Sequence, residues 1–525
     1  MTRPPLRRAR SVAHLVALVA LTALVIARLS RRSPPTQSSA PYAPYAPYAP
    51  YAPYDPFEYA ARHNTVSNLE ASVPAVCYAR TEGGSNVCWS CHSAGSVANP
   101  RIDWELQARY SFSRAALENR WRNVLAPPPT DATTSDAALL AYIRTDNYSS
   151  LRDSLRAQAN AGRIVGWVPD LDLERGFDEH GFARDNSGWR ALRYAPFPGF
   201  GPAAGAAGDV FVRLPVAFRR DEQGHDDPAV YRRNFALLEQ AIVHGPDEPA
   251  PSARYVGLAS NITVTRYRFP EGTEFFHSVR YVDPDAPRGF ARRFRELRYL
   301  RKVEFLDNWA TLRAESAEHE ERDEGRPPRY SGDSRVGLRN AYGWQIQGFI
   351  EDASGRLRAQ TDQETRACMG CHGGVGVTVD STFSFARKLR GDAGWAQQQL
   401  EGVPLPTIRG HREPEPVEWL ARGGAGAFRA HPVLGRWFAR DGSLDRTALA
   451  AIRDYAGLFA APRAVWLEAN RQHLALVRAQ RFELGRDLRA WGPPVHARID
   501  AEDTGLLDAE RVFRDAVPWL EWPQR

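Results

Sequence analysis

Cys368-Met369-Gly370-Cys371-His372 is the stretch on which the interpretation of this 525-residue chain depends, and Cys88-Trp89-Ser90-Cys91-His92 repeats its pattern far upstream. Residues at positions i, i+3 and i+4 of a helical turn lie on one face. Each stretch therefore presents two thiols and one imidazole on the same side. The downstream copy has a helical context, because Thr361–Glu364 fits a capping box and Gly373-Gly374 supplies a stop signal after the histidine.

The spacing C-x-x-C-H is that of a c-type haem attachment site. A single C-x-x-C also occurs in redox dithiols, which favour a thioredoxin-like βαβ pattern that the sequence lacks, and in zinc sites. A zinc site made of both pairs would have to join segments 280 residues apart. The sequence therefore predicts two covalently attached haem c groups. The predicted residues are Cys88, Cys91, Cys368 and Cys371 for the thioether bonds, and His92 and His372 as iron ligands.

The second ligand of each iron is constrained by the near absence of methionine. Met1 and Met369 are the two methionines of the chain. Met369 stands beside the attachment site of its own haem and cannot bind that iron from the opposite side. The His/Met ligation that raises the potential of many small cytochromes c is therefore not expected. Two histidines, another ligand or an open position remain for each iron.

His277 is the first candidate for a further iron ligand, because a strand would place it on the same face as Phe275 and Val279. His63 is the second, since a short loop separates it from the first motif. His411 and His431 are weaker candidates near the second motif. For all of these histidines, a place in the core or on the surface without iron ligation stays open.

Cys77 is the fifth cysteine, and the two motifs use the other four. No intramolecular disulfide is then available to it. A buried structural thiol is the favoured interpretation, with a distal thiolate ligand and a redox-reactive site as alternatives.

Charge is distributed unevenly along the chain. The formal net charge is +6, but residues 1–32 hold seven arginines and no acidic residue, so the remainder is close to neutral. A nearly neutral body gives no electrostatic reason to expect a nucleic-acid partner. Arginine outnumbers lysine 66 to 2, a bias that we attribute to genome composition.

The N-terminal segment indicates export. The apolar run Val12–Ala27 follows basic residues, as in a secretory signal, and arginines follow it at once, which favours an uncleaved anchor over a cleaved signal peptide. No lipoprotein cysteine lies near this run, since the first cysteine is Cys77. The Pro-Tyr-Ala repeat of residues 41–54 favours polyproline II and would form a spacer. We expect the body on the periplasmic or cell-surface side, tethered to the inner membrane if the run is retained.

With two such motifs and an export signal, the chain resembles the broad class of di-haem c-type cytochromes, which includes the bacterial di-haem cytochrome c peroxidases, a related maturation enzyme and rubber oxygenases. The resemblance covers Cys88, Cys91, His92, Cys368, Cys371 and His372. It implies covalently bound haem and a redox role.

We predict an α+β fold in which mostly helical, loop-rich, cytochrome c-like haem segments flank a strand-containing segment. The predicted organisation is 1–33 signal or anchor, 34–56 linker, 57–208 first haem segment, 209–360 α+β segment, 361–413 second haem segment and 414–525 helical C-terminal segment.

Local patterns predict individual elements within these segments. The predicted helices are Ile102–Tyr110, Ala115–Leu125, Asp136–Arg144 and Tyr231–Val243. The predicted strands are Val210–Leu214, Ile262–Phe269 and Phe275–Val282, with a hairpin of Trp344–Glu351 and Arg356–Gln360.

Electron transfer between redox partner proteins, which the sequence does not identify, is the favoured function. The alternative is a peroxidase- or oxygenase-like enzyme with one open haem iron. A third option is a non-redox scaffold in which the haems mainly stabilise the fold. The size of the α+β segment exceeds what a bare carrier needs. However, no acid/base pair near either motif identifies catalytic residues, so electron transfer is preferred.

Overall fold

The computed structural model describes residues 54–63 and 72–523, apart from 130, 132, 165, 200, 252, 325–329, 424–426 and 515–518. Tyr54–Arg525 forms one compact unit, so the haem-motif segments and the strand-containing segment predicted from the sequence fold together. The predicted signal or anchor and most of the Pro-Tyr-Ala repeat lie outside the described residues.

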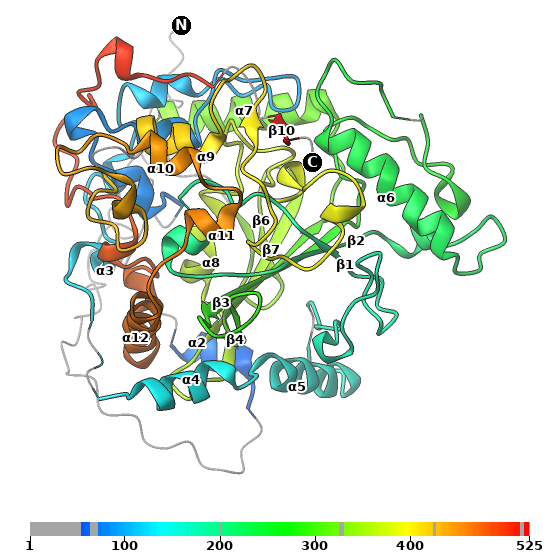
Figure 1. The fold of residues 1–525 in the computed structure, drawn as a ribbon. Helices are drawn as coiled ribbons and strands as arrows, with labels where there is room; N and C mark the ends of the chain where they lie inside the picture. Colours follow the sequence, from blue (N-terminus) through cyan, green and yellow to red (C-terminus); the bar gives the residue numbers. More distant parts are fainter. Residues whose placement is uncertain are drawn as a thin grey trace, which may run out of the picture. The chain divides into compact units, whose positions relative to one another are not determined.

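An antiparallel sheet of eight strands is the centre of the described fold (Figure 1). Its strands follow the order β1-β2-β3-β4-β7-β6-β5, and β8 pairs with β7. The strands are β1 Arg190–Leu192, β2 Val210–Arg213, β3 Glu274–Val282, β4 Phe290–Lys302, β5 Ser331–Asp333, β6 Gly337–Arg339, β7 Trp344–Glu351 and β8 Leu357–Ala359. A separate pair joins β9 Thr407–Ile408 to β10 Leu520–Glu521.

The prediction of a mostly helical fold is wrong, because the sheet dominates the described structure. The main miss is β4, a strand of 13 residues whose sequence contains five arginines. Such a segment suggests a solvated surface, yet Arg293 and Arg295 are buried and paired or stacked within the fold. Sequence patterning detects a strand by its apolar alternation, and buried arginines hide that alternation.

Several local predictions are confirmed. β2 and β3 fall where strands were expected, helix α6 (Pro228–Val243) contains the predicted helix, and β7 and β8 form the predicted hairpin. The predicted strand Ile262–Phe269 is wrong. That segment is irregular, and Tyr267 adopts a φ of 62°, which a β-strand does not allow.

The remaining helices are mostly short. Asp136–Arg144 is helical as predicted and is capped by Ser135, whereas Ile102–Tyr110 and Ala115–Leu125 contain 3₁₀ turns and the single-turn helix α3. The α-helices are α2 Pro56–Arg62, α3 Arg122–Leu125, α4 Asp136–Arg144, α5 Tyr148–Asn160, α6 Pro228–Val243, α7 Asn308–Asp323, α8 Asp362–Met369, α9 Glu415–Glu418, α10 Arg446–Ala450, α11 Tyr455–Leu458 and α12 Arg463–Ala479.

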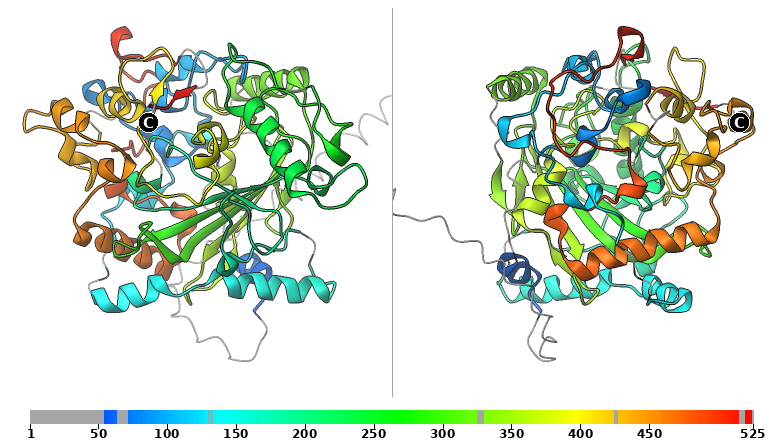
Figure 2. Two further views of the ribbon diagram at one scale, coloured as in Figure 1. Left: turned by 45° about the vertical axis from the view of Figure 1, so that its right-hand side comes forward. Right: turned by 90° about the vertical axis from the view of Figure 1, so that its left-hand side faces the viewer.

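The two faces of the sheet are covered by different parts of the chain (Figure 2). On one face, α2 and α5 pack against a core that includes Phe276 and Phe349. On the other, Cys368 and Met369 of α8 belong to the same buried cluster as Phe275. Because side chains alternate along a strand, His277 lies on the same face as Phe275, the face that carries the second motif.

Candidate functional site: two adjoining C-x-x-C-H turns

Both motifs adopt the same hydrogen-bonded turn. In the first, the carbonyl of Cys88 accepts hydrogen bonds from the amides of Cys91 (3.1 Å) and His92 (3.0 Å). In the second, the carbonyl of Cys368 accepts from Cys371 (3.2 Å) and His372 (3.1 Å). The helix of the second motif begins with the predicted capping box of Thr361 and Glu364. The backbone turn that this spacing predicts is therefore present in both motifs.

Each motif histidine is held by one ring nitrogen. Nδ1 of His92 lies 3.0 Å from Oδ2 of Asp103, and Nδ1 of His372 lies 3.1 Å from the carbonyl oxygen of Ser381. In a neutral imidazole, an acceptor at Nδ1 favours the proton on that nitrogen and leaves Nε2 with the lone pair. Histidines that bind a metal through one nitrogen are oriented in this way by a hydrogen bond at the other.

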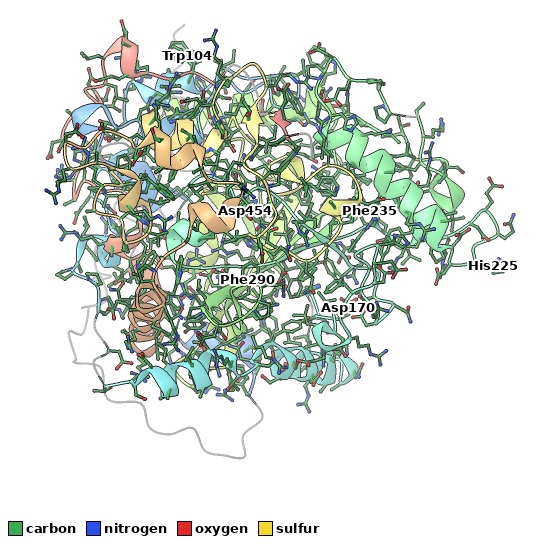
Figure 3. The ribbon with its side chains drawn as sticks, in the orientation of Figure 1. Trp104, Asp170, His225, Phe235, Phe290 and Asp454 are labelled. Atoms are coloured by element: carbon green, nitrogen blue, oxygen red, sulfur yellow. The ribbon has the colours of Figure 1, made fainter. Side chains whose placement is uncertain are left out.

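Asp103 contacts His92 of the first motif and the segment that follows the second motif. Its carboxylate accepts hydrogen bonds from the amide of Ser93 (2.7 Å) and from the amide of Gly376 (3.1 Å), in addition to His92. Burial would raise the pKa of Asp103, but His92, Arg101 and the Ser93 amide hold it below its usual value. The group is therefore a carboxylate. Trp104, the next residue, is 37% exposed and lies at the periphery of the described chain (Figure 3).

The two motifs lie side by side in the fold. The amide of Val377 donates to the carbonyl of Cys91 (3.1 Å), and Nδ2 of Asn99 donates to the carbonyl of Val375 (2.7 Å). The chain after the second motif therefore packs on the chain after the first. The separation of 280 residues in sequence concealed this contact.

Ser381 is positioned by a strained and well-supported turn. Asp380 and Ser381 have φ values of 46° and 58°, a region that costs non-glycine residues about 1–3 kcal/mol each. Buried partners hold the turn in place: Nζ of Lys302 donates to Oδ1 of Asp380 (2.7 Å), and Nε1 of Trp344 donates to its carbonyl (2.8 Å). These contacts of Lys302 and Trp344 with Asp380 hold the carbonyl of Ser381 at Nδ1 of His372.

Burial raises the pKa of three motif thiols, to about 11 for Cys88 and about 12 for Cys371, and it raises that of Cys91 as well. Cys77 lies near the cysteines of both motifs, and burial together with Cys371 and Cys91 keeps its pKa well above the usual value. These groups are thiols at neutral pH. Reactive redox dithiols instead have lowered thiol pKa values, so the geometry does not favour that alternative.

Burial dominates these pKa values, yet Cys88, Cys91, Cys371 and His372 each keep part of their surface accessible to water. Cys368 and Met369, by contrast, are packed in the core at 7% and 1% exposure. The second cysteine and the histidine of each motif are therefore more accessible than Cys368 and Met369.

His277 is the one candidate distal histidine that the described structure places near a motif. It pairs with Arg298 across β3 and β4. Burial, with the charges of Arg298 and His372, lowers the pKa of His277 to about 3. In the described part of the chain, neither of its ring nitrogens is hydrogen-bonded. His277 is therefore a neutral imidazole with a lone pair available, on the face of the sheet beside His372.

The other candidate histidines lie elsewhere. His63 is exposed at the end of α2, where it stacks on Tyr59, and α2 packs on the opposite face of the sheet. Nδ1 of His411 contacts Glu418. Both ring nitrogens of His431 are used, by the carbonyl of Ala203 and by two backbone amides.

Sequence reasoning missed the residues that support the motifs: Asp103, Lys302, Asp380 and Ser381. One signal could have found part of this set. Lys302 and Lys388 are the two lysines in a chain that otherwise uses arginine, and both are fully buried in ion pairs, with Asp380 and Glu239 respectively. The rarity of lysine in this chain could therefore have marked these two positions as candidates for buried ion pairs.

A family model described as a lipoprotein matches residues 61–413, more than half of the chain. The chain belongs to this lipoprotein family. The matched region contains both motifs and the eight-stranded sheet. An uncharacterized lipoprotein of Aquifex aeolicus (strain VF5) is 33% identical over 375 residues, which are 64% of this chain and 64% of that protein. The chain thus spans less than two thirds of its relative's length. No solved structure matches.

The lipoprotein family match shows that the predicted membership of the di-haem c-type cytochromes is wrong. The description of the chain by family as a cytochrome c, haem and metal-binding protein is corrected with it. Within the described residues, no group of three or more His, Cys, Asp or Glu side chains is arranged to hold a metal ion. Neither match addresses what the two C-x-x-C-H turns bind.

Lipoprotein family membership also places the chain among exported, membrane-anchored proteins. Among the helices that the structure describes, none is long and apolar enough to cross a bilayer. The apolar run Val12–Ala27 is not among the described residues.

Proposed function

We propose that this lipoprotein-family member carries two covalent haem c groups and transfers electrons between redox partner proteins outside the cytoplasm. Cys88 and Cys91 would bind one haem and Cys368 and Cys371 the other. Each haem would supply reversible one-electron chemistry at its iron. The tether would be the N-terminal segment, with the body on the periplasmic or cell-surface side.

The observation that carries this proposal is the repeated geometry of the two turns. In both, the carbonyl of the first cysteine accepts from the amides of the second cysteine and the histidine, and the histidine is held at Nδ1. Two segments far apart in sequence form the same backbone turn, and one of the histidines is oriented by a turn in which Asp380 and Ser381 have positive φ. A purely structural pair of cysteines requires none of this.

The adjacency of the turns favours electron transfer over a scaffold role. The backbones of the two motif segments are joined by a direct hydrogen bond from Val377 to Cys91, so two attached groups would be neighbours. The first motif also lies close to the surface, since the His92 side chain is 18% exposed and Trp104 is exposed beside it. A partner protein could exchange electrons there.

A second candidate function is an oxidoreductase in which the iron at the first motif keeps an open position. The asymmetry of the two histidines favours it: His92 is held by a carboxylate, whereas His372 is held by a carbonyl. A carboxylate partner raises the basicity of an imidazole ligand. In addition, none of the candidate distal histidines discussed above lies beside His92 in the described structure.

Mass spectrometry of the full chain, exported from a host competent for cytochrome c assembly, tests the proposal. We expect the mass of two haems on the native protein and of one haem on the variants Cys88→Ala/Cys91→Ala and Cys368→Ala/Cys371→Ala. Cys77→Ala is the matched control and should retain both. A native protein without added haem mass contradicts the proposal. A high-spin first haem that reacts with peroxide would favour the oxidoreductase.

His277→Ala is expected to convert the haem at the second motif from low-spin, six-coordinate to high-spin, because the described structure offers His277 as the neutral imidazole beside His372. Electron paramagnetic resonance of the oxidised protein measures the change. His63→Ala, on the far face of the sheet, should leave the spectrum unaltered. Unchanged low-spin signals in His277→Ala would show that another group is the ligand.

A further inference from the structure

Apolar side chains are exposed next to the first motif. Trp104 is 37% and Phe513 is 43% exposed, and their rings meet edge to face with centroids 4.7 Å apart. Ile102, two residues before Trp104, is 59% exposed. We call Ile102, Trp104 and Phe513 the Trp104 surface, and Figure 3 shows Trp104 at the periphery of the described chain. Exposed apolar side chains that are grouped, and not scattered singly, mark interaction sites.

Both segments that form the Trp104 surface are fixed to the first motif. The residue before Trp104 is Asp103, whose Oδ2 lies 3.0 Å from Nδ1 of His92. Directly after the phenylalanine of the surface, the carbonyl of Arg514 accepts a hydrogen bond from the amide of Ala94 (2.9 Å), two residues beyond the motif. A protein that covers the Trp104 surface therefore lies beside the first motif.

The C-terminal segment of residues 500–513 runs along the chain of the first motif. The amide of Thr504 donates to the carbonyl of Ala108 (2.9 Å). Nδ2 of Asn86 donates to the carbonyl of Glu510 (3.0 Å). The charges of this segment therefore belong to the same side of the molecule as the Trp104 surface.

These charges are mainly acidic. Residues 500–513 hold five acidic side chains and one arginine, and the side chain of Asp508 is 96% exposed. With residues 80–86 and 97–109 included, seven acidic side chains and four arginines keep surface accessible to water, apart from the buried Asp103. The Trp104 surface thus has an apolar aromatic centre and a rim with an excess of negative charge.

We propose that the Trp104 surface docks a basic redox partner protein beside the first haem. The inference rests on the proposed function, because that function supplies the haem and requires a partner. An apolar centre rich in aromatic residues within a polar rim is the usual anatomy of a protein interface. The aromatic residues at such a centre contribute much of the affinity. The acidic rim would accelerate association with a basic partner and slow association with an acidic one.

Binding of a basic mitochondrial cytochrome c to the full haem-loaded chain tests the proposal. The comparison probe is the same cytochrome with its lysines succinylated, which reverses its charge and keeps its haem. Isothermal titration measures Kd, and stopped-flow absorbance measures the association rate. We expect the unmodified cytochrome to bind at least about tenfold more tightly at low ionic strength, and its association rate to fall as salt is added.

Trp104→Ala/Phe513→Ala should raise the Kd for the unmodified cytochrome about 30-fold, the effect of removing central aromatic anchors. Both side chains are exposed, so the variant should fold and keep two haems, which intact mass verifies. Trp309→Ala is the matched control, because Trp309 is 71% exposed and lies near the start of α7. The end of that helix, at Arg322, is the part that contacts Glu105 beside the Trp104 surface.

Asp508→Lys should lower the association rate with the unmodified cytochrome about threefold and weaken its dependence on salt, because the rim loses negative charge. Asp226→Lys makes the same change of charge elsewhere and should leave the rate unaltered. Asp226 is 78% exposed and follows His225, which Figure 3 shows well separated from Trp104.

Two results would overturn the proposal in a protein that carries both haems. One is equal Kd values for Trp104→Ala/Phe513→Ala and Trp309→Ala, and the other is equal affinity for the unmodified and succinylated cytochromes. Binding to phosphatidylcholine vesicles that Trp104→Ala/Phe513→Ala abolishes would assign the surface to a membrane and overturn the proposal as well. Absence of haem mass on the native first motif would instead refute the proposed function.

Discussion

Asp380→Asn is expected to lower the free energy of unfolding by about 3–5 kcal/mol, the usual cost of removing one partner from a buried ion pair. Lys302 has no exposed side-chain surface, and its Nζ lies 2.7 Å from Oδ1 of Asp380. Burial lowers the pKa of Lys302, and Asp380 is the partner that opposes this effect. The isosteric amide keeps the shape of the turn but leaves the ammonium group without a counter-charge. Urea denaturation followed by circular dichroism measures the loss.

The same substitution should also affect the second motif, since the Asp380–Ser381 turn holds Nδ1 of His372. Lys302→Met/Asp380→Asn should recover part of the stability, because both charges are then gone. Glu304→Gln breaks an ion pair with Arg339 in which both side chains are about half exposed, and should cost less than about 1 kcal/mol. Equal losses in the free energy of unfolding for Asp380→Asn and Glu304→Gln would contradict the stabilising role given to the Lys302–Asp380 ion pair.

Gly370→Ala is expected to cost about 3 kcal/mol of stability through overpacking and to prevent haem attachment at the second motif in most molecules. The C-x-x-C-H pattern itself allows any residue at this position, and the φ of −62° at Gly370 suits alanine. The obstacle is tertiary: an added Cβ would lie 1.8 Å from the carbonyl oxygen of Ser72. Either that segment or the turn carrying Cys371 must move.

Gly373→Ala is the matched control for this prediction, since the atoms nearest to an added Cβ there are 3.5 Å away, an ordinary contact. Intact mass should show two haems on Gly373→Ala and mainly one on Gly370→Ala, with a lower urea midpoint for the latter. Two haems and a native urea midpoint in Gly370→Ala would contradict this prediction. They would show that the segment containing Ser72 moves to accommodate the added methyl group.

The elements that sequence patterns located correctly are those with a conventional apolar period or a local cap. β3, β7 and α6 alternate or repeat as expected, and the capping box of Thr361 and Glu364 is formed. β4 was missed because arginines that the fold buries and pairs resemble a solvated surface. The fold class was wrong for the same reason, since β4 pairs with both β3 and β7 and joins the sheet.

The sequence by itself determined the location of the two motifs and the residues of each that share a turn, because the spacing of C-x-x-C-H fixes them. It also predicts that neither proposed haem has a distal methionine, since the methionines of the chain are Met1 and Met369. Only the tertiary structure decided that the two turns adjoin, that Asp103 and Ser381 orient the histidines, and that His277 and not His63 lies beside a motif. These contacts join residues up to hundreds of positions apart, and local periodicity carries no information about pairing at such separations.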